Sequence, residues 1–173
     1  MAELVYYVAS TLDGFIAHED GSFDGFKWDD DVIADFLADQ ESFGTVLMGR
    51  KTYDVGLKDG KTSPYPSMRQ VVFSRTLESS PDPAVELVKG NIPEFVTGLK
   101  ANADRPIWLC GGAEIASTLM NAGLIDRLVV KLNPVVFGGG IRLVSALGQI
   151  VSLELEKTKQ YSCGIIMLTY GVR

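Results

Sequence analysis

The sequence predicts an α/β protein of three layers, in which helices cover both faces of a mostly parallel mixed sheet and an antiparallel hairpin ends the chain. Short apolar runs of strand length alternate with stretches whose apolar residues repeat at helical spacing, a pattern typical of β–α–β units. Near the end of the chain, Leu153 and Leu155 alternate with acidic residues, and Ile165 and Met167 alternate after a Ser-Cys-Gly step. These two runs predict the hairpin.

The length and composition predict one domain over residues 1–173, because 173 residues with 46% hydrophobic content are enough to bury a single core. The formal net charge of −6 argues against nucleic acid or an anionic membrane as the main partner. Cys110 and Cys163 lie far apart, which supports neither a disulfide framework nor a metal site. Because Met1–Val5 carries an acid and no apolar run reaches membrane-spanning length, we expect a cytoplasmic protein.

The first half of the chain predicts three strands and two helices. An apolar run over Leu4–Ala9 is typical of a buried strand, and the Asp13-Gly14 step after it is a turn signal. The polar stretch His18–Lys27 predicts a long loop of the kind that covers active sites. Acidic residues at Asp29–Asp31 favour the first turn of a helix that ends near Gly44. The remaining elements expected here are a strand at Phe15–Ala17, a strand at Thr45–Met48 and a short helix from Arg50 that ends before Lys58–Pro66.

The second half predicts more strands and helices in alternation. A β-branched run over Leu124–Val136 predicts a central strand, and Gly138–Gly140 after it frees the backbone for a tight turn or a close approach to a ligand. Pro93 is tolerated in the first turn of a helix, and Gly123 is placed to end one. The other elements expected are strands at Gln70–Phe73, Val85–Leu87 and Ile107–Cys110, and helices at Ile92–Ala101 and Ala113–Asn121.

Two of these strands end at glycine and lead directly into a helix. Thr45–Met48 is followed by Gly49-Arg50-Lys51-Thr52, and Ile107–Cys110 is followed by Gly111-Gly112-Ala113-Glu114-Ile115. Glycine lets the backbone approach an anion closely, and the first free amides and the dipole of the helix attract it. Two such corners beside one crevice predict a bound dinucleotide.

Cations near these corners favour NADP over NAD. Arg50 and Lys51 fall in the first turn of a helix, where positive charge opposes the dipole and calls for a compensating anion; an ordinary solvated helix start is the alternative. Ser74-Arg75 ends another strand, and a ribose 2′-phosphate needs such a hydroxyl and fork-like donor. The first corner does not fit the phosphate loop of nucleotide hydrolases, and Gly111-Gly112 lacks the Rossmann spacing.

Several motifs follow one another along the chain: Ser10-x-x-Asp13-Gly14-Phe15-Ile16-Ala17, a loop with Trp28, Met48–Tyr53, Phe73-Ser74-Arg75, Gly111–Glu114 and Asn133–Gly140. In this order they resemble the dihydrofolate reductase superfamily, and most of all its branch related to the reductase domain of riboflavin biosynthesis. The resemblance implies a sheet flanked by helices with NADPH lying across the strand ends, and a homodimer by analogy with other members.

The same resemblance assigns roles to the corner residues. It implies that Gly49, Arg50, Lys51 and Thr52 hold the pyrophosphate and 2′-phosphate region, and that Ser74 and Arg75 contact the adenosine side. Backbone amides of Gly111, Gly112, Ala113, Glu114 and Ile115 would bind the pyrophosphate and the nicotinamide.

In two features this chain departs from the proteins that it resembles. Dihydrofolate reductases carry an acid on the first helix to hold the pterin, and that position falls near Val32 or Ile33 here, both apolar. The zinc deaminase that accompanies many riboflavin reductases is also missing, because the chain has one His and no Cys-x-x-Cys. The first departure disfavours dihydrofolate, and the second predicts the reductase half only.

A reductase also needs a proton for the atom that gains electrons, and the candidate donors are Asp13 and Asp31, with Asp35 one turn further along the helix. A turn role for Asp13 and a capping role for Asp31 are the alternatives. We predict an NADPH-dependent reductase of a small heterocyclic or phosphoribosylamino-pyrimidine substrate, similar to 5-amino-6-(5-phosphoribosylamino)uracil reductase. An NADP(H)-binding module without turnover and a dihydrofolate reductase are the alternatives.

Overall fold

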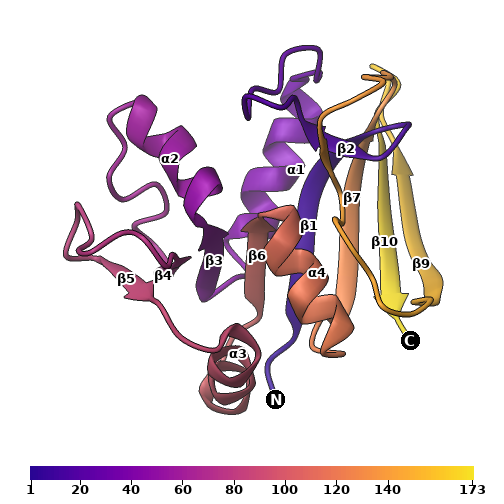
Figure 1. The fold of residues 1–173 in the computed structure, drawn as a ribbon. Helices are drawn as coiled ribbons and strands as arrows, with labels where there is room; N and C mark the ends of the chain where they lie inside the picture. The colour runs from indigo at the N-terminus through magenta and orange to yellow at the C-terminus, as the bar shows by residue number, and fades with distance from the viewer.

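A computed structural model describes residues 1–173, and its centre is a sheet of eight strands in the order β5-β4-β3-β6-β1-β7-β10-β9 (Figure 1). The strands from β5 to β7 in this order are parallel, whereas β10 pairs antiparallel with both β7 and β9. In chain order the strands of this sheet are β1 (Leu4–Thr11), β3 (Thr45–Gly49), β4 (Arg69–Phe73), β5 (Val85–Val88), β6 (Ile107–Gly111), β7 (Arg127–Asn133), β9 (Leu153–Gln160) and β10 (Ile166–Val172).

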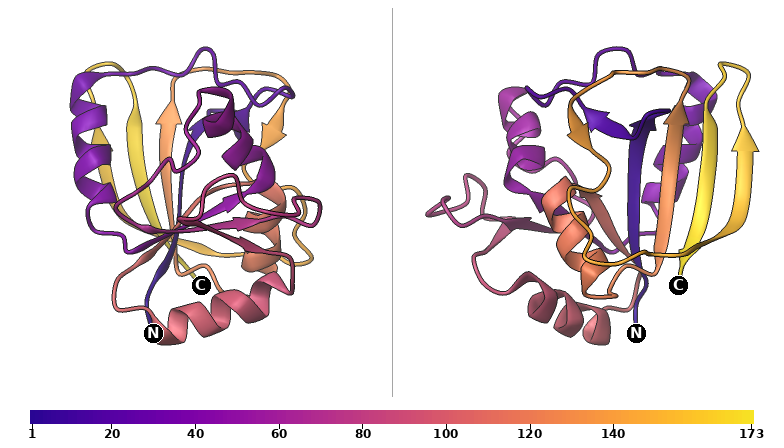
Figure 2. Two further views of the ribbon diagram at one scale, coloured as in Figure 1. Left: turned by 90° about the vertical axis from the view of Figure 1, so that its left-hand side faces the viewer. Right: turned by 45° about the vertical axis from the view of Figure 1, so that its right-hand side comes forward.

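Four helices cover the two faces of the sheet, and Figure 2 shows α1 and α4 on opposite sides of it. The helices are α1 (Asp30–Gln40), α2 (Arg50–Lys58), α3 (Ile92–Asn102) and α4 (Ala113–Asn121). One buried cluster joins the sheet to α3 and α4 through Val96, Leu99 and Leu119, and the other joins it to α1 and α2 through Val32 and Tyr53. These two cores confirm the predicted three layers.

The central strands are buried on both faces. In β3, all five residues are buried, and their apolar side chains enter the two cores alternately. β1 lies between β6 and β7, so that the carboxyl ends of β3, β4, β6, β1 and β7 meet at one edge of the sheet. In open parallel sheets, this edge is where ligands bind.

Most predicted elements are confirmed to within a few residues, and the differences have local causes. The run at Leu124–Val136 forms a strand only over Arg127–Asn133, because the side chain of Asp126 accepts the backbone N–H of Leu4 (2.7 Å) and fixes the chain before β7. Helix α1 ends at Gln40 and not near Gly44. The sequence did not predict β8 (Ile141–Arg142), which pairs with β2 (Phe15–Ala17) in a small second sheet.

Candidate functional site

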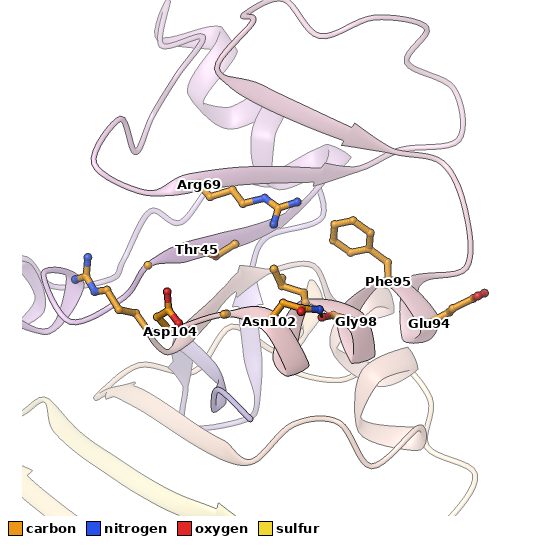
Figure 3. Close-up of a pocket in the computed structure, with 11 residues that line it drawn as sticks. Thr45, Arg69, Glu94, Phe95, Gly98, Asn102 and Asp104 are labelled. Atoms are coloured by element: carbon orange, nitrogen blue, oxygen red, sulfur yellow. Dashed lines mark hydrogen bonds between the residues drawn. The ribbon is translucent and has the colours of Figure 1, made fainter.

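A large cleft with a volume of about 1280 Å³ lies over the carboxyl ends of the central strands. Its walls come from segments far apart in the sequence, which include Met48–Thr52, Phe73–Thr76, Cys110–Ile115 and the aromatic residues of the loop before α1. A smaller hollow of about 600 Å³ lies between α3 and the amino ends of β3 and β4, where Arg69 lies near Phe95 (Figure 3). Arg69 is already paired with Glu86 there, so the larger cleft is the candidate site.

The two glycine corners meet inside the cleft. A β-carbon on Gly112 would lie 3.6 Å from Cα of Gly49, and one on Gly111 would lie 3.4 Å from the hydroxyl oxygen of Thr52. Gly112 has a φ of +110°, which favours glycine, and a β-carbon on Gly49 would lie only 3.0 Å from Cδ1 of Ile115. The two corners can pack this closely because their glycines have no side chains, and the backbone atoms of the corners form a narrow cradle.

The helices that start at these corners lack the caps that the other two helices carry. Asp29 accepts an amide of α1 and Asn91 accepts one of α3, whereas neither Gly49 before α2 nor Gly112 before α4 supplies a side-chain cap. First-turn amides without a capping side chain remain available to an external acceptor, and the helix dipole favours an anion there. Both amino termini open into the cleft.

The cleft is cationic although the chain as a whole is acidic. Its only acidic lining residues are Asp59, just after α2, and Glu114, in the first turn of α4. The end of the cleft over β4, β3 and β6 is lined by five basic residues: Arg50, Lys51, Lys61, Arg75 and Lys89. Such an excess of positive charge in a concave site attracts phosphate groups.

The predicted cofactor residues line this end of the cleft, and two of them also form hydrogen bonds within the protein. Nε of Arg50 donates to Asp54 (2.7 Å), which orients the guanidinium along α2 and leaves its outer nitrogens free. The Ser74 hydroxyl oxygen accepts the backbone amides of Thr76 (3.3 Å) and Leu77 (3.0 Å), so that it fixes the turn that carries Arg75. The other predicted cofactor residues that line the cleft are Gly49, Lys51, Thr52, Arg75, Gly111, Gly112, Ala113, Glu114 and Ile115.

The other end of the cleft lies over β1 and β7 and is lined largely by aromatic and apolar groups. Tyr7 and Phe36 meet edge to face there with ring centroids 5.4 Å apart, and the Tyr65 hydroxyl contacts Sγ of Cys110 at 3.4 Å. Burial raises the pKa of the Cys110 thiol to about 11 and also raises the pKa of Tyr65, so both groups are neutral at pH 7. The aromatic and apolar groups of this end therefore suit a flat ring.

The structure does not place the predicted proton donors in the cleft. The Asp13 carboxylate accepts the Thr11 hydroxyl (2.5 Å) and the amides of Phe137 (3.1 Å) and Gly138 (2.7 Å), so it ties β1 to the loop before β8. Asp31 lies in the first turn of α1 and Asp35 pairs with Lys159 and the Tyr161 hydroxyl, and none of the three lines the cleft. The carboxylates of Asp13 and Asp35 are thus engaged in contacts within the protein.

Sequence reasoning missed two cations of the aromatic end, Lys131 and Arg142. Arg142 belongs to β8, a strand that was not predicted, and its guanidinium carbon lies 5.3 Å from the Phe15 ring centroid. Lys131 interrupts the apolar run of β7, and a lysine within a central strand is a sequence signal from which a functional position could have been predicted.

This fold and cleft define an α/β domain whose large cleft lies at the carboxyl ends of its parallel strands. The sequence places the chain within a family: it belongs to the RibD C-terminal domain family, which it matches over residues 2–167. YyaP, an uncharacterized protein of Bacillus subtilis, is 32% identical over 179 residues, which cover 96% of this chain and 93% of YyaP. The predicted family resemblance is thus confirmed.

Solved structures agree with the fold. A Shewanella sp. PV-4 protein named for riboflavin biosynthesis superposes with a TM-score of 0.86 at 28% identity, covering 100% of this chain and 99% of that one. The diaminohydroxyphosphoribosylaminopyrimidine deaminase/5-amino-6-(5-phosphoribosylamino)uracil reductase of Thermotoga maritima gives 0.72 at 16% identity over 98% of this chain and 56% of its own. The dihydrofolate reductase of Enterococcus faecalis, complexed with NADP(H), gives 0.69 at 17% identity over 98% and 94%. The fold is therefore dihydrofolate reductase-like, and the family supports a reductase-like role.

No group of three or more His, Cys, Asp or Glu side chains is arranged to hold a metal ion. None of the four helices is long and apolar enough to cross a membrane.

Proposed function

We propose that the protein is an NADPH-dependent reductase that transfers a hydride to a small heterocyclic or phosphoribosylamino-pyrimidine substrate. The observation that carries this proposal is the contact between the two glycine corners, which brings two uncapped helix amino termini to one cleft. Family membership supports a reductase, and the cations of the cleft support a phosphorylated cofactor.

In this proposal, different residues of the cleft bind different groups of the cofactor. The amides at Gly49–Thr52 and Gly111–Ile115 hold the pyrophosphate, with the Arg50 guanidinium and the Lys51 ammonium as its countercharges. Arg75 holds the 2′-phosphate, which is the group that separates NADPH from NADH. When bound, the nicotinamide supplies the hydride, and the neutral groups around Cys110 exclude water from the place where it meets the substrate.

Dihydrofolate as the substrate has little support from the cleft. Helix α1 contributes Phe36 to the lining and no carboxylate, and Val32 is buried in the core. A pterin held by an acid therefore lacks its partner in this site. An NADP(H)-binding module without turnover is the second candidate, favoured by the absence of every predicted carboxylate donor from the lining.

Titration with NADPH and NADH, followed by the fluorescence of the reduced nicotinamide, tests the cofactor. We expect NADPH to bind tighter than NADH, and Arg50→Ala to weaken NADPH binding by about 1 to 3 kcal/mol through the lost charge-assisted contact. Oxidation of bound NADPH across a panel that includes dihydrofolate and the phosphoribosylaminouracil of riboflavin synthesis then separates the enzyme from the silent module. Equal affinity for the two cofactors, or no binding of either, refutes the proposal.

We also propose that the protein works as a cytoplasmic homodimer of single domains, with β9 at the interface. This strand is the edge of the large sheet and is exposed along its whole length, with Leu153 43% and Leu155 54% exposed. An edge strand with free backbone groups and exposed leucines is stabilised by pairing with another copy.

A further inference from the structure

Lys131 is a cation without a countercharge in the aromatic end of the cleft. It lies in β7 beside Ala9 of β1, and both residues line the cleft. The Lys131 side chain takes part in none of the seven ion pairs of the protein. It is partly buried, and burial lowers the pKa of its ammonium, so the charged form is held there at a cost.

The contact that Lys131 does make leaves its hydrogen-bonding capacity unused. Its Nζ lies 4.5 Å from the centroid of the Trp28 ring, whose electron-rich face attracts the charge. A ring face takes no conventional hydrogen bond, so the three N–H donors of the ammonium remain available to an acceptor in the cleft. Trp28 thus positions the Lys131 ammonium without accepting a conventional hydrogen bond from it.

Carboxylates of the first loop and of α1 are paired with groups other than Lys131. Asp13 is bound to loop amides and Asp35 to Lys159 and Tyr161, while the Tyr7 hydroxyl donates to Asp39 (3.1 Å). Of the two acidic residues of the cleft lining, Asp59 directly follows α2 and Glu114 lies in α4, both at its other end. The second cation of this end, Arg142, is also absent from the ion pairs of the protein.

We propose that this end of the cleft selects substrates that carry an anionic oxygen, as carboxylate, phosphate or deprotonated ring oxygen, and that Lys131 is the residue that binds it. The inference rests on the proposed reductase function and names the class of its substrate. A partly desolvated ammonium with free donors gains a charge-assisted hydrogen bond from an oxyanion, whereas a neutral ring leaves it unpaired. Lys131 is therefore a determinant of specificity in the cleft.

Fluorescence quenching tests the anion site without assuming the shape of the substrate. The chain has two tryptophans, and Trp108 is only 2% exposed whereas Trp28 is 60% exposed, so quenching reports on Trp28. Iodide should quench Trp28 more strongly than caesium does, and Lys131→Met should lower the iodide quenching constant at least roughly two-fold while that of neutral acrylamide stays the same. An iodide constant that Lys131→Met leaves unchanged overturns the proposal.

A matched pair of ring ligands tests the substrate class. Orotate and its amide share a pyrimidine ring and differ in one negative charge, and calorimetric titration should show orotate binding roughly ten-fold tighter. Lys131→Met should remove this preference and Lys131→Arg should keep most of it. Lys27→Met should also keep it, because Nζ of Lys27 donates to the carbonyl of Cys163 (2.7 Å) and lies outside the cleft lining.

Three results would overturn the proposal: equal binding of the two ligands, no binding of orotate, or a preference that survives in Lys131→Met. NADPH binding, measured separately by nicotinamide fluorescence, distinguishes this failure from failure of the proposed function. A protein that prefers orotate through Lys131 but binds no NADPH supports the anion site and refutes only the reductase.

Discussion

The hydroxyl oxygen of Thr52 lies 3.4 Å from the point that a β-carbon on Gly111 would occupy, although 59 residues separate the two positions in the sequence. The pairing of β3 with β6 produces this contact, because both strands end at the same edge of the sheet and each leads into a helix. The two glycine corners are thus parts of a single cradle, in which a β-carbon on either Gly111 or Gly112 would come into van der Waals contact with the other corner.

Substitution of Gly112 tests this cradle directly. Gly112→Ala places a side chain at a φ of +110° and 3.6 Å from Cα of Gly49, so we expect a loss of about 1 to 3 kcal/mol in the free energy of unfolding and weaker NADPH binding. Urea denaturation and cofactor titration measure the two effects. Gly98→Ala is the control: it lies in α3 with open space around it, and we expect it to raise stability by about 0.5 to 1 kcal/mol.

Arg75 tests the choice between the two nicotinamide cofactors. If it holds the 2′-phosphate, Arg75→Ala should weaken NADPH binding by about 1 to 3 kcal/mol and leave NADH binding unchanged. Arg69→Ala removes a guanidinium from the smaller hollow at the opposite end of β4 and should change neither affinity. A parallel loss of both cofactors in Arg75→Ala would show that this residue contacts a group that they share.

Substitution of Asp13 tests whether its carboxylate has a structural or a catalytic role. The Thr11 hydroxyl, followed by the amides of Gly138 and Phe137, holds the pKa of Asp13 below its usual range. A depressed folded-state pKa stabilises the protein above the unfolded-state pKa, and this stabilisation is lost as the pH falls through the lower, folded-state value. Asp13→Asn should therefore unfold more readily in urea at pH 7, with a smaller further loss on acidification below about pH 4 than the wild type shows.

The same variant should bind NADPH with unchanged affinity, since Asp13 does not line the cleft. A reductase whose hydride transfer disappears in Asp13→Asn at full stability would assign this carboxylate to catalysis.

The proposed cofactor end of the cleft could be predicted from the sequence, whereas most of the aromatic end could not. Gly49 and Gly111 each interrupt an apolar run at a strand end, and the order of strands and helices along the chain is enough to place such corners at one edge. Tyr65, Cys110 and Lys131 reach the cleft from a loop and two different strands, and only the strand order brings them to one end of it. The turn position of Asp13 was visible in the sequence, but its amide partners were not, because they lie 124 and 125 residues away.

Lys100 and Asp126 form an ion pair whose two halves should respond differently to substitution. The Lys100 side chain is 7% exposed and donates to Asp126 (2.5 Å) and to the carbonyl of Leu124 (2.8 Å), whereas the Asp126 side chain is 40% exposed. Asp126→Ala leaves a buried ammonium without its countercharge and the amide of Leu4 without its acceptor, so it should be the more destabilising change.

Lys100→Met removes the buried charge and fills the same space, and should cost clearly less than Asp126→Ala in urea denaturation. The double variant should lose less than the sum of the two single variants, because the second substitution then adds only the loss of the acceptor of the Leu4 amide. Equal losses in the two single variants would contradict this asymmetry.

Leu155 tests the proposed interface. Leu155→Asp places a charge on the exposed strand β9, and light scattering should show a shift from dimer toward monomer, because burying an unpaired carboxylate at the interface is unfavourable. Leu37→Asp is a closely matched control, since Leu37 lies on α1 and is also 54% exposed; it should leave the mass unchanged. β9 lies at the far edge of the sheet from β3 and β4, so NADPH binding should persist in a monomeric Leu155→Asp protein. Loss of cofactor binding on dissociation would instead mean that the second copy contributes to the cleft.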